Sequence, residues 1–195
     1  MLNKDSVKNL FSESRKTISE AKYCIFIVTI LYCCALVIGW AYPDNFPFLQ
    51  EVTGKLADKF LDKKSIAFVL QIFAHNLFAT YLTMCLIVLF GIIPASIAIF
   101  NGIIMGWVIA KVSGVAGSEI AVMIVPHGIF ELPAMMIAWG IGIWRGFGYR
   151  FSETRLTSKE RWRKANIVFF TMVLPLLFFA AIIEGRYHIL KEFFK

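Results

Sequence analysis

Long apolar segments alternate with short polar ones along this chain. One bilayer crossing needs roughly 20 consecutive apolar residues in a helix. Proline, glycine and short polar stretches divide the apolar residues into segments of about this length or longer, with Pro43 after the first and Gly91 and Pro94 between the second and third. These segments are 23–42, 66–90, 94–112, 119–147 and 165–185. The pattern predicts an all-α, polytopic membrane helical bundle with about five transmembrane helices.

Three further segments carry apolar residues at helical spacing among charged residues, which is typical of amphipathic helices at a membrane interface. They are residues 3–22, 44–65 and 186–195. We find no internal repeat, low-complexity tract or linker. The sequence therefore predicts a single integral membrane domain over residues 1–195.

The composition supports a membrane protein. Of the 195 residues, 58% are hydrophobic and 17% are charged, and the mean hydropathy is +0.70. A soluble domain of this length has no interior large enough for so many apolar side chains. The net charge of +7 comes from basic residues that flank the apolar segments, so it favours membrane orientation and not nucleic-acid binding.

The distribution of lysines and arginines predicts the orientation of the chain. Five precede the first span and seven lie between residues 145 and 164. On the other side of a five-span bundle lie four between residues 43 and 65, Lys111, and three in the tail. Because cytoplasmic loops carry the excess of basic residues, we expect a multi-pass cell-membrane protein with its N-terminus in the cytoplasm and its C-terminus outside.

Small residues recur every four positions in the third and fourth predicted spans. The positions are Ala98, Gly102, Gly106 and Ala110, and then Ala134, Ala138, Gly142 and Gly146. A spacing of four advances only about 40° around a helix, so each ladder forms a groove that another backbone can approach closely. The ladders predict a tight bundle in which these two helices pack on each other, and they favour a homo-oligomer.

A second pattern consists of polar side chains within the apolar segments. The set is His75, Asn76, Asn101, His127, Glu131 and Glu184. His127 and Glu131 share one helix face with Ala134 and Ala138, and a charge at the bilayer centre costs about 2.5 to 3.5 kcal/mol. We therefore expect this face to contact protein and not lipid. At 1.5 Å per residue, His75 and Asn76 lie ~14 Å into their span, close to the ~12 and 18 Å of His127 and Glu131.

Three interpretations of this polar set stay open. The side chains can hydrogen-bond between helices and to carbonyls freed by Pro126 and Pro133. They can line a path for an ion, a proton or a ligand, which a broken helix at residues 126–128 would suit. They can also bind a metal, with His127, Glu131 and His75 as candidate ligands.

Catalytic motifs are missing from the sequence. It contains no HExxH, no GxSxG, no Walker lysine and no paired catalytic aspartates. We therefore assign no catalytic residue, and the sequence leaves the cofactor unknown apart from the candidate metal.

The segment Val125–Ala134, with the sequence VPHGIFELPA, resembles the signature of the stage II sporulation protein M family. Asn76 within AHNLFA, Gly91, the segment FNGIIMG at 100–106 and the segment AAIIEG at 180–185 follow the order of that family. The resemblance covers roughly residues 66–185.

This resemblance implies a membrane protein of about five spans. It also implies a role like that of the family's namesake, a membrane anchor for peptidoglycan-remodelling enzymes during engulfment. The namesake has no accepted catalytic activity of its own. We therefore expect a non-enzymatic scaffold that contacts membrane lipid and recruits protein partners. A transporter or channel with a polar path is the alternative hypothesis, and a metal-dependent membrane enzyme is the third.

Overall fold

The computed structural model describes the backbone of residues 4–51, 66–86, 91–147 and 156–193, and the side chains within them except 4, 66–69, 72, 112–127 and 184–193. Every element in this part of the chain is helical. The elements are α1 (Lys4–Ala41), η1 (Pro43–Asn45), α3 (Ile66–Cys85), α4 (Ile92–Gly146), α5 (Ser158–Val168), η4 (Phe169–Val173) and α6 (Leu174–Phe193). The predicted all-α class is confirmed.

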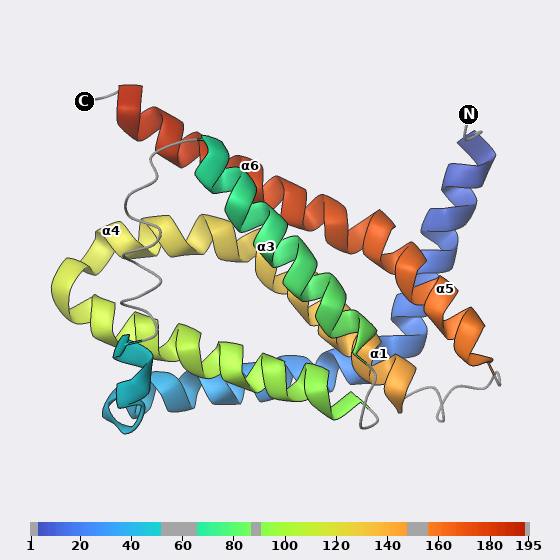
Figure 1. Ribbon diagram of the computed structural model, residues 1–195, viewed down its shortest axis with the longest axis horizontal. Helices are drawn as coiled ribbons and strands as arrows, with labels where there is room; N and C mark the ends of the chain where they lie inside the picture. Colours follow the sequence, from blue (N-terminus) through green and yellow to red (C-terminus); the bar gives the residue numbers. More distant parts are fainter. Residues whose placement is uncertain (1–3, 52–65, 87–90, 148–155, 194–195) are drawn as a thin grey trace.

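Three helices are long and apolar enough to cross a membrane, among the residues that the structure describes. They are Asp5–Ala41, Ile92–Lys111 and Ser158–Ile183. The later part of α1, the first part of α4 and α6 run in one direction, and α3 and the last part of α4 run broadly the opposite way (Figure 1). The chain is thus a membrane protein with antiparallel helices, and the count of five spans stays a prediction.

The N-terminal segment differs from its prediction. Residues 3–22 and 23–42 were expected as an interfacial helix and a separate span, whereas Lys4–Ala41 form one helix that changes direction along its length (Figure 1). The Ser14 and Thr17 hydroxyls each donate to the carbonyl four residues earlier, at 2.9 Å, and such bonds often bend helices. The polar first part and the apolar later part of this segment therefore belong to one continuous, bent helix.

The third and fourth predicted spans are also continuous. The helix α4 runs from Ile92 to Gly146 and turns back on itself in its yellow-green middle (Figure 1), so the break expected at residues 111–118 is helical. This stretch contains the pairs Ser113–Gly114 and Gly117–Ser118, and Gly/Ser pairs are frequent places for sharp bends. We call residues 92–111 the first limb of α4 and residues 128–146 the second limb.

Two local features set the ends of these helices. Gly91 precedes α4 with φ of 89°, a left-handed conformation that glycine adopts without steric cost, and a Cβ there would come within 2.8 Å of the Ile143 Cα. Thr157 and Glu160 form a capping box that starts α5, so this helix begins before the predicted span 165–185. Pro175 follows the π-helical turn η4, in which the Leu174 N–H donates to the Phe169 carbonyl.

The remaining boundaries are simpler. The helix α3 ends at Cys85 within the predicted span 66–90, and α6 continues to Phe193 through the predicted junction at residue 186. Of the expected amphipathic segment 44–65, residues 47–51 are helical and 52–65 lie outside the described residues.

The second limb of α4 lies at the centre of the bundle. Its Ala134, Ala138 and Trp144 pack in one buried cluster with residues of α3, α5, η4 and α6. Its Met136 and Trp139 pack in another cluster with Val28, Tyr32 and Ala98, which belong to α1 and the first limb. This central limb carries residues 128–134 of the motif that resembles the family signature, so most of the motif lies at the centre of the bundle.

The small residues of the first limb lie against α1. A Cβ on Gly102 would collide with the Tyr32 carbonyl oxygen at 2.5 Å, and one on Gly106 would collide with the backbone of Leu36 and Trp40. In the second limb, Ala134 and Ala138 are fully buried and a Cβ on Gly142 would come within 2.9 Å of Pro94. The two ladders therefore do not pair along their length as expected, because the groove of the first one is filled by α1.

Candidate functional site

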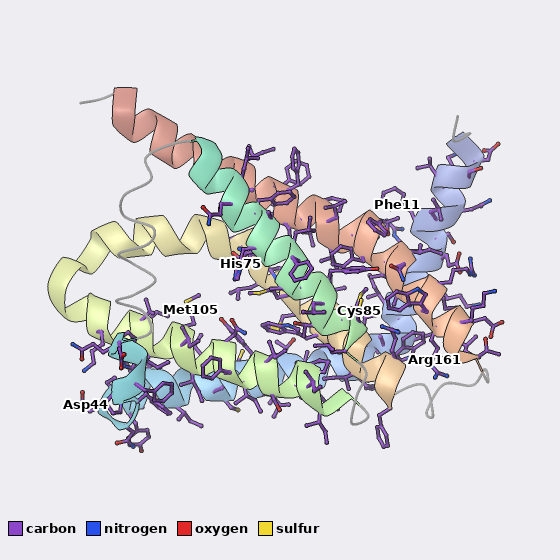
Figure 2. The ribbon with its side chains drawn as sticks, viewed as in Figure 1. Phe11, Asp44, His75, Cys85, Met105 and Arg161 are labelled. Carbon is purple, nitrogen blue, oxygen red and sulfur yellow. The ribbon has the colours of Figure 1, made fainter. Side chains whose placement is uncertain are left out.

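A hollow of about 500 Å³ lies between α3 and the two limbs of α4. The side of α3 that lines it carries His75, Asn76, Thr80 and Thr83. The remaining lining comes mainly from the two limbs of α4, together with Leu36 of α1. Figure 2 labels His75 and Met105, which belong to two of its walls. The hollow thus brings together side chains from segments more than 50 residues apart in the sequence.

Helical periodicity explains which side chains line the hollow. On the first limb they are Ile97, Asn101, Met105 and Ile109, which directly precede the four ladder positions. A shift of one residue turns a helix by about 100°, so one stripe of the limb contacts α1 while the neighbouring stripe lines the hollow. Asn101 lies in the middle of the candidate span Ile92–Lys111, which places the hollow at the depth of the membrane interior.

A hydrogen bond joins α3 to the second limb of α4 at the edge of this hollow. The Asn76 Nδ2 donates to the Glu131 Oε1 at 2.7 Å, and Glu131 is only 8% exposed. Glu131 therefore faces protein together with Ala134 and Ala138. A bond of this kind satisfies two polar groups that lipid could not satisfy.

The other polar side chains of the hollow have different environments. Asn101 donates through Nδ2 to the carbonyl of Ile97 at 2.8 Å, and Thr83 donates to the carbonyl of Ala79 at 2.7 Å. His75 is exposed, whereas Thr80 and Thr83 are buried. The hollow therefore combines an accessible imidazole with amide and hydroxyl groups that are fixed to their own helices or buried.

Two predicted site residues cannot be placed at the level of side chains. His127 belongs to α4 and Glu184 to α6, and both side chains lie outside the described residues. The backbone of α4 is helical through residues 126–128 and Pro133, so the broken helix expected at this point is not found. Among the described side chains, no group of three or more His, Cys, Asp or Glu could hold a metal ion, and the predicted metal site, which includes His127, stays a prediction.

Arg145 is a further buried polar residue, at the end of the second limb, and it is not among the six polar residues that the sequence predicted as a site. Its exposure is 5%, its Nη1 donates to the Met84 carbonyl at 2.8 Å, and its guanidinium lies 4.4 Å from the centre of the Trp162 ring. Arg145 thus links α3, α4 and α5. The sequence signal was present, because Arg145 lies between the ladder positions Gly142 and Gly146 and within the predicted span 119–147.

Comparison with known families decides the relationship that the signature suggests. The family model described as stage II sporulation protein M matches residues 26–187, which is most of the chain. The chain belongs to the stage II sporulation protein M family. All residues that line the hollow fall within the match, whereas residues 4–25 of α1 precede it. No curated protein and no solved structure matches the chain.

Family membership and the apolar helices together establish a membrane protein of the stage II sporulation protein M type. The hollow between α3 and α4 is the candidate functional site, since it places four of the six predicted polar residues around one space.

Proposed function

We propose that this protein is a non-enzymatic membrane scaffold that recruits protein partners through the hollow between α3 and α4. The observation that carries the proposal is the open, partly polar hollow at membrane depth, with His75 exposed at its edge. Lipid chains offer no hydrogen bond to the exposed imidazole of His75, so contact of this group with lipid is costly in a bilayer. A transmembrane helix of a partner would cover the hollow and hydrogen-bond to its polar groups.

Two further points support a scaffold. Membership of the stage II sporulation protein M family agrees with the anchoring role that the resemblance implies. The side chains of Leu70, Phe78 and Leu82 are exposed and form a stripe along α3, with spacings of eight and four residues, next to the face that lines the hollow. Such a stripe suits a second helix that packs lengthwise against α3.

Purification of the tagged chain after mild crosslinking in its native host tests the scaffold. We expect a defined partner to copurify with the wild type, to be lost or reduced with His75→Leu, and to persist with Phe26→Leu. Phe26 is a suitable control because it is 64% exposed on α1 and does not line the hollow. A wild-type chain that is recovered alone in every growth condition would contradict the proposal.

The same hollow favours a second candidate, a transporter or channel whose path includes His75, Asn76, Asn101 and Glu131. Polar groups at membrane depth often mark such paths. Reconstituted vesicles test it, with flux of protons and monovalent cations as the measurement. A path predicts flux in the wild type that Glu131→Leu abolishes, whereas vesicles no more permeable than empty ones would contradict it.

A further inference from the structure

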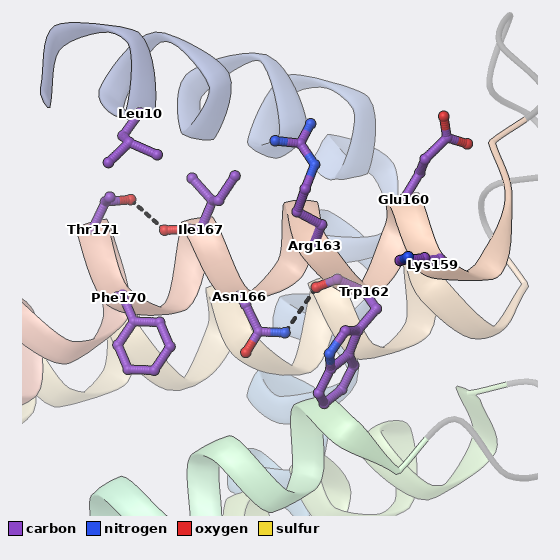
Figure 3. Close-up of a pocket in the computed structure, with 9 residues that line it drawn as sticks. All are labelled: Leu10, Lys159, Glu160, Trp162, Arg163, Asn166, Ile167, Phe170 and Thr171. Atoms are coloured by element: carbon purple, nitrogen blue, oxygen red, sulfur yellow. Dashed lines mark hydrogen bonds between the residues drawn. The ribbon is translucent and has the colours of Figure 1, made fainter. Parts of the chain in front are cut away.

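A second space, of about 600 Å³, lies between the beginning of α1 and the segment formed by α5 and η4. We call it the arm groove, because α1 extends beyond the bundle as an arm at this point (Figure 1). Leu10, Ile167 and Phe170 lie toward one end, and Lys159, Trp162 and Arg163 lie toward the other (Figure 3). The groove therefore passes from an apolar end to a cationic end.

The arm is fixed in place by specific contacts with α5 and η4. Both guanidinium Nη atoms of Arg163 donate to the Glu13 carboxylate, at 3.2 and 2.5 Å, and Lys164 pairs with Glu20 at 2.9 Å. The Ser14 and Thr171 hydroxyls share a hydrogen bond of 2.5 Å. The groove is thus a formed feature of the fold and not a chance gap between separate helices.

The charges at the cationic end are available to a ligand. Lys159 is exposed and makes no ion pair with any residue that the structure describes. Arg163 retains N–H groups beyond those that bind Glu13. The one acidic side chain of the lining, Glu160, accepts hydrogen bonds from the backbone N–H and the hydroxyl of Thr157, so its carboxylate is held at the start of α5, and Lys159 and Arg163 outnumber it in the lining.

The wider surroundings are also basic. Residues 4–22 contain five basic and three acidic side chains, and residues 158–168 contain four basic and one acidic. Basic clusters next to membrane helices attract anionic lipids, with about 1 kcal/mol for each Lys or Arg near the surface. A soluble anion would leave the apolar end of the groove unfilled, and an uncharged lipid would leave the cationic end without a partner.

We propose that the arm groove binds one anionic phospholipid. Its phosphate lies at Lys159 and Arg163, and one acyl chain lies along Leu10, Ile167 and Phe170. The lipid packs between α1 and α5 and reinforces the contact that holds the arm. This site is separate from the hollow between α3 and α4, and it does not depend on the proposed scaffold function.

Photocrosslinking of the full chain tests the site. The variant Phe170→benzoylphenylalanine places a group that reacts with C–H bonds inside the groove. Phe178→benzoylphenylalanine is the matched control, because Phe170 and Phe178 are 57% and 53% exposed and only Phe170 lines the groove. Both are reconstituted in vesicles of equal parts phosphatidylglycerol and phosphatidylcholine with identical acyl chains, and the lipid adducts are identified by mass spectrometry.

We expect the ratio of phosphatidylglycerol to phosphatidylcholine adducts to be about five-fold higher at Phe170 than at Phe178. A five-fold ratio corresponds to one basic contact of about 1 kcal/mol. Lys159→Gln should remove most of this enrichment, and Lys16→Gln, an equal charge change on the exposed face of the arm, should leave it in place. Because Lys159 is exposed and has no ion-pair partner among the described residues, its replacement leaves the fold intact.

Equal adduct ratios at Phe170 and Phe178 would overturn the proposal, as would enrichment that survives Lys159→Gln or falls equally with Lys16→Gln. A discrete protein adduct at Phe170 in living cells, in place of a lipid adduct, would assign the groove to a protein partner instead.

Discussion

The hydrogen bond between Asn76 and Glu131 is the residue-scale feature that connects the family signature to the rest of the fold. Glu131 belongs to the signature on the second limb, and Asn76 lies on α3, 55 residues earlier. Hydrogen bonds between membrane helices contribute about 0.6 kcal/mol on average and up to about 1.7. The bond therefore specifies which faces of the two helices meet and contributes modestly to their stability.

A double-mutant cycle with Asn76→Leu and Glu131→Leu measures this bond. We expect a coupling of about 0.5 to 2 kcal/mol in the free energy of unfolding in detergent, since either single change already removes this bond and the second change then costs less. The cycle of Glu131→Leu with Asn101→Leu is the control, because Asn101 donates to its own helix. A coupling between Asn76 and Glu131 no larger than that of the control would show that the bond is not formed.

Arg145 gives a second prediction at this scale. Its guanidinium both donates to the carbonyl of Met84 and stacks on Trp162, and lysine lacks the planar group that stacks. We expect Arg145→Lys to lower the free energy of unfolding by about 1 to 2 kcal/mol, from the lost stacking on Trp162 and weaker hydrogen bonding. Arg161→Lys, at a less buried arginine that donates to the carbonyl of Leu156, should change it less, and an equal effect would contradict this role.

At the scale of elements, the sequence predicted the ladders of small residues but not their partners. A spacing of four shows only that another backbone comes close. It does not say which one, because every apolar segment of a membrane protein offers a comparable surface. The structure assigns the first ladder to α1, where Gly39 in turn meets the backbone of Ile103. The continuity of α1 and α4 was missed for a related reason, since polar residues and glycines mark a change of surroundings or a bend without always ending a helix.

The contact between α1 and α4 yields a prediction with a control in the same helix. A Cβ on Gly106 would collide with the carbonyl of Leu36 and lie 2.7 Å from the Trp40 nitrogen. We expect Gly106→Ala to reduce stability by about 1 to 3 kcal/mol, as overpacking does. At Gly128 a Cβ would meet Leu132, at 3.6 Å, and no other side chain that the structure describes, so Gly128→Ala should be neutral or slightly stabilising. Thermal unfolding in detergent compares the two, and equal effects would argue against this packing.

At the scale of the whole molecule, the class, the membrane character and the family were all readable from the sequence, because hydropathy and the motif are local properties. The hollow was only partly readable. Comparable depths suggested that Asn76 and Glu131 approach each other, but Thr80 and Thr83, which also line the hollow, carry no signal that separates them from ordinary core residues. The cytoplasmic N-terminus and the external C-terminus rest on the distribution of basic residues and stay predictions.

The central claim is that the hollow between α3 and α4 receives a helix of a protein partner. Photocrosslinking in living cells from Ile129→benzoylphenylalanine tests it most directly, because Ile129 lines the hollow and is 59% exposed. Phe26→benzoylphenylalanine is the control from an exposed position of α1 away from the hollow. The scaffold predicts a discrete protein adduct at Ile129 that is missing at Phe26. Lipid adducts alone at both positions would contradict it.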